Sequence, residues 1–426
     1  MEKIKVALIC HFSNTLVRDH LNLYGDNNKF FDFSNWITNI INGLKKHSDI
    51  ELHVIAPHPS MKSPIQIFEI EGVSYYFFRK AYPFLLEQIE ERLGLQRLRN
   101  YPRNRKYIRD FLSMINPDVV NLIGAENPYY SSAALDINNK PIILHCQTVY
   151  ANPERMKKAA NISRQRWKIE IELFQKIKYI ACTGRMYYNL VKSYSPEAFI
   201  FPRVWPPSPF PLVKDVPKKY DFVYFARYLN RNKGFDNAIE AIGLAVKKHP
   251  ELKFLAVGTW GEDKSHFEKR IRELGIEDNI QILPSFPKYI DMLQCVKQAK
   301  FALLPIKMDV VSGTILEAMR LGLPVVTSRT SGTPALNEKY ETVLISDIDD
   351  CDKLSMNIIK LYEDEELANR LKNNSFQYLK EKDEISARNT DIMIAQYKAV
   401  IDHYNNGTPI PEYLLYKTEE IKDYRN

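Results

Sequence analysis

Two acidic residues, Asp309 and Glu317, lie eight positions apart around the small residues Gly313 and Thr314. If a helix begins here, its first backbone N–H groups have no partner within the helix, and with the positive end of the helix dipole they attract phosphate oxygens. Carboxylates accept hydrogen bonds from vicinal hydroxyls, so Asp309 could hold a sugar and Glu317 a ribose. The alternative is that Asp309 is a solvated loop acid and Glu317 a surface helix residue. The segment has the pattern of a nucleotide-sugar site.

The elements around these acids can be read from the same segment. Residues 301–304 are apolar and predict a short buried strand, and Ser312 is a typical N-cap for a helix over 313–321. Gly322 suits the position just past the end of that helix.

A second group of residues precedes this segment by about 80 positions. The run 220–226 predicts a strand, and Arg227, Lys233 and Gly234 follow it before a helix over 235–247. Cations at the carboxyl edge of a parallel sheet would neutralise a diphosphate, and arginine can do so with two hydrogen bonds. The alternative is that Lys233 and Gly234 form only a turn and that Arg227 is a surface residue.

Together these motifs resemble the retaining glycosyltransferases of family 4, which have the GT-B fold. The resemblance rests on Arg227, on Lys-Gly at 233–234 and on the acid-x7-Glu pattern that ends in the Glu-Ala-Met-x-x-Gly-x-Pro-Val-Val of 317–326, and it is strong over 220–385. It implies that the first acid contacts the donor sugar, the second acid the ribose, and the Arg/Lys pair the diphosphate. This chain departs from the family at Asp309, where relatives usually have glutamate, so the carboxylate reach is shorter by one methylene.

The fold expected is α/β, with two Rossmann-like domains whose parallel sheets face a cleft. Six prolines in residues 201–217 predict an extended linker. Apolar runs alternate with helical patterns on both sides of it, as in βαβ units. The predicted parts are an acceptor-binding domain over 1–200, a linker over 201–218, a nucleotide-sugar-binding domain over 219–384, and, over 385–426, a helix that crosses back to the first domain plus a tail.

The individual elements follow from the same alternation. The predicted strands are 3–10, 51–56, 73–78, 118–123, 141–146 and 178–182 before the linker, and 220–226, 252–257, 279–283, 300–304, 324–327 and 342–346 after it. The predicted helices of the first domain are 34–46, 103–115, 163–175 and 185–193.

Two residues at predicted strand ends of the first domain are candidates for the reaction centre and the acceptor. His145 resembles the family's strand-terminal histidine, which lies near the donor sugar, although a histidine there can also be purely structural. Glu126 resembles a Gly-Thr-Glu turn of relatives and could bind a hydroxyl, or it could simply form a turn before Asn127 and Pro128.

The loop after the first predicted strand is long for a βα connection, and such loops are usually functional. Arg18, His20 and Trp36 are the candidate acceptor contacts in it, with Trp36 alternatively the first core residue of the helix over 34–46. Relatives often carry a Gly-Gly turn here, whereas this loop has only Gly25, which predicts an altered acceptor pocket.

Charge is distributed unevenly along the chain. Residues 1–200 hold 27 Lys and Arg against 19 Asp and Glu (+8), residues 201–218 hold 3 against 1 (+2), and residues 219–426 hold 29 against 32 (−3), which sums to +7. Most cations of 92–109 alternate with apolar residues, so this segment could lie on an anionic membrane surface or form a solvated helix face. No nucleic-acid-binding motif accompanies the charge, and we expect no nucleic-acid partner.

Other motifs and classes find little support. There is no dinucleotide-binding, P-loop or zinc-protease motif. Asp347 and Asp349 match the metal-binding Asp-x-Asp of another glycosyltransferase fold, but they are predicted to cap a helix over 351–361, so no metal and no cofactor are expected. Five scattered cysteines and the lack of a long apolar segment favour a cytoplasmic protein, peripheral at most to the inner face of the membrane.

The functional prediction is a retaining glycosyltransferase. It would move a sugar from a UDP- or GDP-sugar donor to a carbohydrate or lipid-linked hydroxyl, in polysaccharide or glycolipid synthesis of the bacterial type. A nucleotide-sugar epimerase and a non-catalytic sugar-binding GT-B protein are the alternatives.

Overall fold

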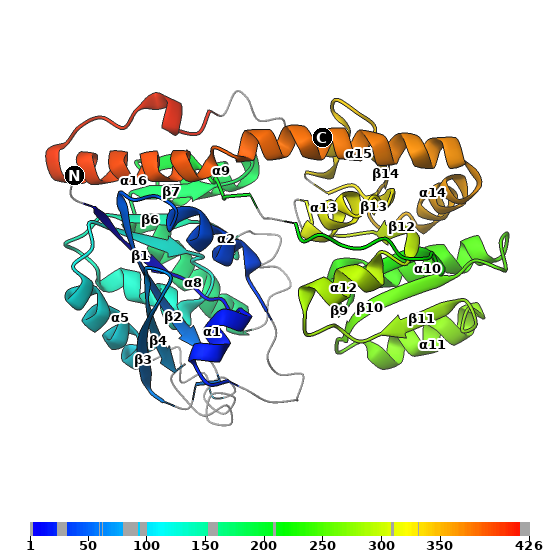
Figure 1. Cartoon of the computed structure of the whole chain (residues 1–426), viewed down its shortest axis with the longest axis horizontal. Helices are drawn as coiled ribbons and strands as arrows, with labels where there is room; N and C mark the ends of the chain where they lie inside the picture. Colours follow the sequence, from blue (N-terminus) through cyan, green and yellow to red (C-terminus); the bar gives the residue numbers. More distant parts are fainter. Residues whose placement is uncertain are drawn as a thin grey trace. The chain divides into compact units, whose positions relative to one another are not determined.

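The computed structural model describes residues 3–23, 32–58, 60–61, 63–79, 93, 100–151, 161–207, 210–307, 311–330 and 332–417, without the side chains of 161–165. The chain divides into two compact units. The first unit comprises residues 1–208 and 386–422, and the second comprises 209–385 and 423–426. Each unit is built on one sheet with helices packed against it (Figure 1).

The sheet of the first unit has eight strands in the order β3-β4-β2-β1-β5-β6-β7-β8. All its neighbouring strands are parallel except β3 and β4, which pair antiparallel. The strands are β1 (Ile4–Ile9), β2 (Ile50–His58), β3 (Ile65–Ile70), β4 (Val73–Arg79), β5 (Val119–Ile123), β6 (Ile142–His145), β7 (Tyr179–Cys182) and β8 (Phe199–Pro202).

Helices cover both faces of this sheet. Inward side chains of β1, β2 and β5 form one core with α1, α2 and α16, whereas α5 packs against β1, β2 and β4. The helices are α1 (Thr15–His20), α2 (Asn35–Leu44), α5 (Pro102–Ile115), α6 (Pro128–Ser131), η1 (Ser132–Asp136), α8 (Asn161–Lys176), α9 (Arg185–Tyr194), α16 (Asn389–Asn406) and η4 (Glu412–Leu414).

The sheet of the second unit has six parallel strands in the order β11-β10-β9-β12-β13-β14. Their bounds are β9 (Tyr220–Leu229), β10 (Phe254–Trp260), β11 (Ile280–Leu283), β12 (Ala299–Leu304), β13 (Val325–Ser328) and β14 (Val343–Ser346).

Two apolar cores lie on opposite faces of this sheet. Alternate side chains of β9 and β10 point to opposite faces, so one set packs with α10, α11 and α14 and the other with α12 and α13. The helices are η2 (Arg231–Lys233), α10 (Phe235–Val246), α11 (Lys264–Leu274), α12 (Tyr289–Val296), α13 (Gly313–Arg320), η3 (Thr333–Asn337), α14 (Cys351–Glu363) and α15 (Glu365–Ser386).

The α/β class and every strand predicted from the sequence are confirmed, with bounds that differ by a few residues. Two strands were missed. The run of β3 is short and half exposed, and β8 uses the start of the predicted linker. Pro202 ends β8 at the edge of the sheet, where its missing N–H removes no ladder bond. The stretch 201–217 is therefore not linker throughout.

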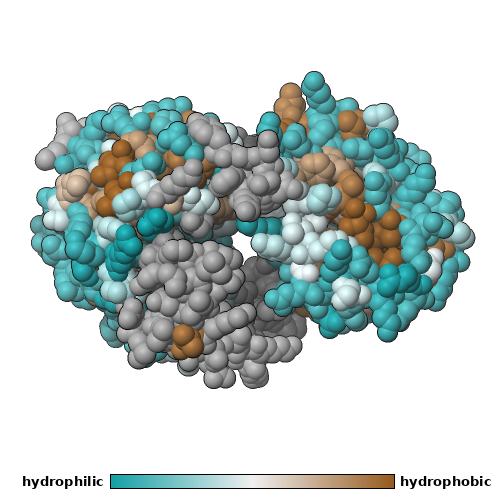
Figure 2. Space-filling view, turned by 90° about the horizontal axis from the view of Figure 1, so that it is seen from below, coloured by the Kyte–Doolittle hydropathy of each residue, from teal (hydrophilic) through white to brown (hydrophobic). Residues whose placement is uncertain are grey.

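All five cysteines are free, and four of them are buried. Within the described helices, none combines the length and apolarity needed to cross a membrane. The described surface seen in Figure 2 is mainly hydrophilic, with smaller hydrophobic groups on both units.

Candidate active site

The second unit has one point at which the order of its strands reverses. From β9 the chain moves outward through β10 and β11, and then returns to β12 on the other side of β9. In open parallel sheets, ligands bind at the carboxyl ends of the strands at such a reversal. Here those ends lead into the loop 230–234 after β9 and the segment 305–312 after β12.

The loop after β9 is held in a fixed conformation. The side chain of Asn230 accepts a hydrogen bond from the backbone N of Lys233 at 3.0 Å, and the hydroxyl of Tyr224 donates to the carbonyl of Lys233 at 3.1 Å. Gly234 has φ +76°, and a Cβ there would lie 1.7 Å from the carbonyl oxygen of Pro305. Only glycine permits this approach. The two loops at the reversal therefore touch through backbone atoms.

Arg227 lies near the end of β9 and is exposed. Its guanidinium lies 5.5 Å from the centre of the Tyr228 ring, and its carbonyl accepts a hydrogen bond from Ser285 Oγ at 3.1 Å. Within the described residues, no carboxylate lies within ion-pair distance of this guanidinium. Its charge is available to an anion.

The helix start predicted from the sequence is present. Ser312 precedes α13 in an extended conformation, and Gly322 follows the helix at φ +73°. The Ser312 hydroxyl bonds to the hydroxyl of Thr314 at 3.0 Å instead of capping the helix. Gly313 faces open space, since no atom would lie within 4 Å of an added Cβ. Asp309 lies outside the described residues, so its predicted contact with a sugar stays a prediction.

Glu317 is not the solvated surface acid of the alternative interpretation. Its carboxylate accepts a hydrogen bond from the hydroxyl of Tyr289 on α12 at 2.8 Å. Burial raises the pKa of Glu317, and the hydrogen bond from Tyr289 opposes that rise. Tyr289 could not be predicted from the sequence, because its contact with α13 depends on how α12 packs.

A cluster of charges at the same edge was missed by the sequence analysis. Lys307, just after β12, donates to Asp236 Oδ2 at 2.9 Å and to Asp349 Oδ1 at 2.5 Å. The ammonium thus joins the loops after β12 and β14 to the first turn of α10. In the sequence, only the position of Lys307, three residues beyond a buried strand, indicated a charged group at this edge of the sheet.

The predicted cap of α14 needs a correction. Asp350, rather than Asp347 or Asp349, accepts a hydrogen bond from the backbone N of Lys353 and caps the helix. Asp347 pairs with Arg329 at 2.8 Å. Asp349 has φ +67° and points to Lys307, so the tertiary ion pair decides its direction.

In the first unit, the strand order reverses between β1 and β5, and Glu126 follows β5. Gly124 has φ +84°, and a Cβ there would lie 2.8 Å from Glu126 Oε2. The Glu126 side chain is 6% exposed and accepts a hydrogen bond from Asn127 at 3.2 Å. The carboxylate therefore folds back over the end of β5.

His145 ends β6 and is fully buried. Its Nδ1 lies 2.8 Å from Asn121 Oδ1, and Asn121 Nδ2 donates to the hydroxyl of Tyr397 on α16. Burial first, and the charge of Arg203 second, lower the pKa of His145 to about 3. The imidazole is therefore neutral near pH 7, and its predicted catalytic role stays a prediction.

The three candidate acceptor contacts near the start of the chain have separate neighbours. Arg18 pairs with Asp32 at 2.8 Å, and the ring of His20 stacks on Phe68 at 5.3 Å. Trp36 is 37% exposed and stacks on another tryptophan, Trp205, at 5.9 Å with an interplanar angle of 5°. It is thus neither a fully buried core residue nor isolated at the surface.

Arg203 was not predicted from the sequence. It follows β8, donates to the carbonyl of Cys146 at 2.8 Å, and lies 4.1 Å from the centre of the Trp205 ring. Burial lowers its pKa. The many prolines of 201–217 predict a linker, whereas the apolar residues directly before Arg203 indicate the end of a strand.

Comparisons with known proteins give one family match and several similar structures. Residues 212–378 match the family model described as glycosyl transferases group 1. A search of curated proteins found no match. A sucrose-phosphate synthase from Thermosynechococcus elongatus is similar in structure, with a TM-score of 0.69 and 14% identity over 93% of this chain and 100% of that one.

Two further solved structures are similar over nearly their whole length. WaaG, a glycosyltransferase involved in lipopolysaccharide biosynthesis, has a TM-score of 0.61 and 14% identity, over 94% of this chain and 100% of that one. An E. coli trehalose-6-phosphate structure bound with UDP-2-fluoro glucose has a TM-score of 0.63 and 10% identity, over 92% and 99%.

These likenesses show the fold, which is that of GT-B proteins. The residues that match the model for glycosyl transferases group 1, 212–378, lie in the second unit. Together the findings support a glycosyltransferase.

Proposed function

We propose that this protein transfers a sugar from a nucleoside diphosphate sugar, UDP or GDP-linked, to a hydroxyl acceptor with retention at the anomeric carbon, as in family 4. One observation carries the proposal. The exposed Arg227 lies near the carboxyl end of β9, and the loop with Lys233 follows that strand, at the point where the strand order reverses. Both residues lie within 212–378, the residues that match the glycosyl transferases group 1 model.

The chemistry assigned to the second unit is stabilisation of a leaving group. The bond between the anomeric carbon and the diphosphate oxygen breaks, a bond to the acceptor oxygen forms, and the proton of the acceptor hydroxyl leaves with the departing diphosphate. Arg227 and Lys233 balance the negative charge that develops on the diphosphate, with the backbone N–H groups of Gly313 and Thr314 as further donors. Preorganised charges of this kind act without reorganising during the reaction.

Two carboxylates are assigned to orient the donor. Glu317 would accept hydrogen bonds from the ribose hydroxyls, and its bond to Tyr289 supports this by fixing the direction of the carboxylate. Asp309 would contact the donor sugar. Its shorter side chain, compared with the family's glutamate, would place the sugar closer to the loop.

We assign the acceptor to the first unit. Glu126, Arg18, His20 and Trp36 are its proposed contacts, and His145 is proposed to lie near the transferred sugar. A carbohydrate or lipid-linked acceptor in polysaccharide or glycolipid synthesis is consistent with the likeness to WaaG, which is involved in lipopolysaccharide biosynthesis.

Membrane contact through 92–109 is a separate part of the proposal. Three of its four described cations on α5 pair with carboxylates of the same unit, Arg105 and Arg109 with Asp136 and Lys106 with Asp110 at 2.7 Å. The fourth, Arg103, donates to the hydroxyl of Tyr107 at 2.9 Å. These pairs reduce the charge available to anionic lipid, so any attraction is weaker than the sequence count predicts.

We propose that the reaction needs no metal. The acids that could imitate a metal-binding Asp-x-Asp already have cationic partners, since Asp347 pairs with Arg329 and Asp349 with Lys307. The two assigned cations, Arg227 and Lys233, would supply the positive charge instead.

The test is substitution of the cations at the strand reversal. Arg227→Ala and Lys233→Ala are expected to lower transfer from UDP- or GDP-sugars by about 100-fold or more, because each removes charge from the leaving group. Thermal unfolding should remain close to that of the wild type. Turnover is measured by release of the nucleoside diphosphate, with and without acceptor, so that transfer is separated from epimerisation.

Arg231→Ala is the matched control, since Arg231 lies in the same loop but faces Asp263 at 3.8 Å. It should retain turnover within a few-fold of the wild type, as exposed ion pairs contribute little. Wild-type turnover in both Arg227→Ala and Lys233→Ala would contradict the proposal.

A further inference from the structure

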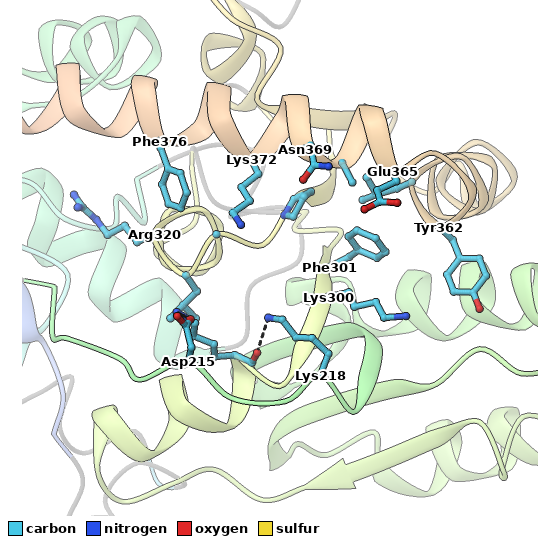
Figure 3. Close-up of a pocket in the computed structure, with 16 residues that line it drawn as sticks. Asp215, Lys218, Lys300, Phe301, Arg320, Tyr362, Glu365, Asn369, Lys372 and Phe376 are labelled. Carbon is cyan, nitrogen blue, oxygen red and sulfur yellow. Dashed lines mark hydrogen bonds and ion pairs between the residues drawn. The ribbon is translucent and has the colours of Figure 1, made fainter.

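A cavity of about 790 Å³ lies at the edge of the second sheet opposite to the strand reversal loops. Lys218 precedes β9, Lys300 and Phe301 stand near the start of β12, and Pro324 precedes β13 (Figure 3). These are the amino ends of the strands, whereas Arg227 and Lys233 stand at or beyond a carboxyl end. We call this cavity the basic pocket, and it is distinct from the proposed donor site.

Positive charge dominates the lining of the basic pocket. Five cationic and two acidic side chains line it. The cations are Lys218, Lys297, Lys300, Arg320 and Lys372, and the acids are Asp215 and Glu365.

Three of the five cations are neutralised by carboxylates of the same unit. Lys300 pairs with Asp221 at 2.9 Å, Arg320 donates to Asp383 at 2.8 Å, and Lys297 pairs with Asp215 at 2.8 Å. In Figure 3 the ammonium of Lys300 and the guanidinium of Arg320 point away from the space between the walls.

The remaining two cations point into that space. Lys372 extends from α15 and Lys218 from the strand side, so they approach the same volume from opposite walls (Figure 3). Lys218 donates to the carbonyl oxygens of Lys297 at 2.8 Å and Ala299 at 2.9 Å. Across the described part of the chain, neither Lys218 nor Lys372 has a carboxylate within ion-pair distance.

The two ammonium groups raise each other's electrostatic energy. Burial first, and then the charges of Lys297 and Lys372, lower the pKa of Lys218. Asp215, which pairs with Lys297, attracts both ammonium groups and offsets part of this repulsion. A bound anion would offset more of it.

The wall that carries Lys372 is firmly placed. Gly322 has φ +73°, and a Cβ there would lie 3.1 Å from Phe376 Cζ and 3.3 Å from Lys372 Cε. The turn after α13 thus packs directly against α15, and the stem of Lys372 rests on it. Phe301 and Phe376 add apolar surface to the lining. A fixed wall reduces the entropy that binding would cost.

We propose that the basic pocket binds a small phosphorylated anion, a phosphate ester or a diphosphate, between Lys218 and Lys372. A phosphate group carries oxygens on all sides and close to two negative charges, so it can accept from two ammonium groups on opposite walls at once. The volume is in the range of small-molecule pockets.

The probe is inorganic diphosphate, titrated calorimetrically into the whole chain. Because diphosphate would also enter the proposed donor site, the titration uses the Arg227→Ala/Lys233→Ala double variant as background. Lys372→Gln in that background is expected to weaken binding by about tenfold, since a hydrogen bond to a charged group is lost. Lys372→Glu should weaken it further.

Lys380→Gln is the matched control, because Lys380 is also an exposed lysine of α15 but does not line the pocket. In the Arg227→Ala/Lys233→Ala background, the Lys380→Gln variant should bind diphosphate as tightly as the background protein itself. Equal affinities for Lys372→Gln and Lys380→Gln, or no diphosphate binding in the background, would overturn the proposal. Retention on phosphatidylglycerol vesicles without binding of free diphosphate would also overturn it, in favour of a lipid headgroup.

Discussion

At the scale of single residues, burial changes what a titratable side chain can do. Burial raises the pKa of Glu317 on α13. The hydrogen bond from the Tyr289 hydroxyl holds the Glu317 carboxylate in a fixed direction. A fixed carboxylate suits recognition of paired hydroxyls better than a solvated one, because less side-chain entropy is lost on binding. The type and position of Glu317 were evident from the sequence, but its partner was not.

His145 gives a prediction about pH. Its pKa is about 3 in the folded chain, against an ordinary value of 6.5. Between these values the unfolded state binds more protons, so the free energy of unfolding falls as pH falls from about 6.5 toward 3. His145→Asn should lower the slope of the free energy of unfolding with pH by up to one proton in this range, or about 1.4 kcal/mol per pH unit. Denaturant unfolding at a series of pH values measures it.

His20→Asn serves as the control for that series, since His20 is exposed and stacks on Phe68. It should keep the pH dependence of the wild type. If His145→Asn keeps that dependence as well, the buried neutral imidazole is not the proton-linked group that the structure indicates.

At the scale of elements, the contact between the loops after β9 and β12 depends on one glycine. Gly234→Ala places a Cβ 1.7 Å from the carbonyl oxygen of Pro305, so the loops must separate. We expect a loss of stability of about 2–4 kcal/mol, from strain at positive φ and from overpacking, together with weaker donor binding. Thermal unfolding with and without UDP-sugar measures both.

Gly275→Ala separates the two causes. Gly275 ends α11 at φ +66°, but an added Cβ there would meet nothing within 4 Å. It should cost only the backbone strain of about 1–2 kcal/mol and leave donor binding unchanged. Equal losses of stability in the two variants would mean that the close contact between Gly234 and the Pro305 carbonyl oxygen does not contribute to stability.

At the scale of the whole molecule, the first unit completes its core with a helix that is distant in sequence from its strands. The helix α16 contributes Met393, Ile394, Tyr397 and Val400 to the core of the first unit, although it begins 195 positions after the end of α9, the preceding helix of that unit. Its Tyr397 also closes the polar chain from His145 through Asn121.

Ending the chain at Arg388 should therefore destabilise the first unit selectively. Removing large buried side chains costs roughly 2–5 kcal/mol each, and several such losses approach the whole stability of a domain. Scanning calorimetry should show loss of one unfolding transition while that of the second unit remains. The surface substitution Lys398→Ala, which breaks only the exposed pair with Asp49, should leave both transitions in place. An unchanged first transition after truncation would contradict this assignment of α16.

The sequence by itself determined the α/β class, the strands of both sheets apart from β3 and β8, and the helix start at Ser312 and Gly313. Those features depend on local periodicity and on caps and turns, which neighbouring residues encode. Arg227 and Lys233 were also singled out, because they follow a predicted strand, and Glu317 was singled out by its spacing from Asp309.

Only the tertiary structure decided the contacts between elements. It joined Lys307 to Asp236 and Asp349, gave Glu317 its partner Tyr289, moved the cap of α14 to Asp350, and placed Arg203 on Trp205. It also gathered the lysines of the basic pocket from separate strands and helices. These contacts depend on which faces pack together, and packing is set by residues far apart in the chain that no local pattern records.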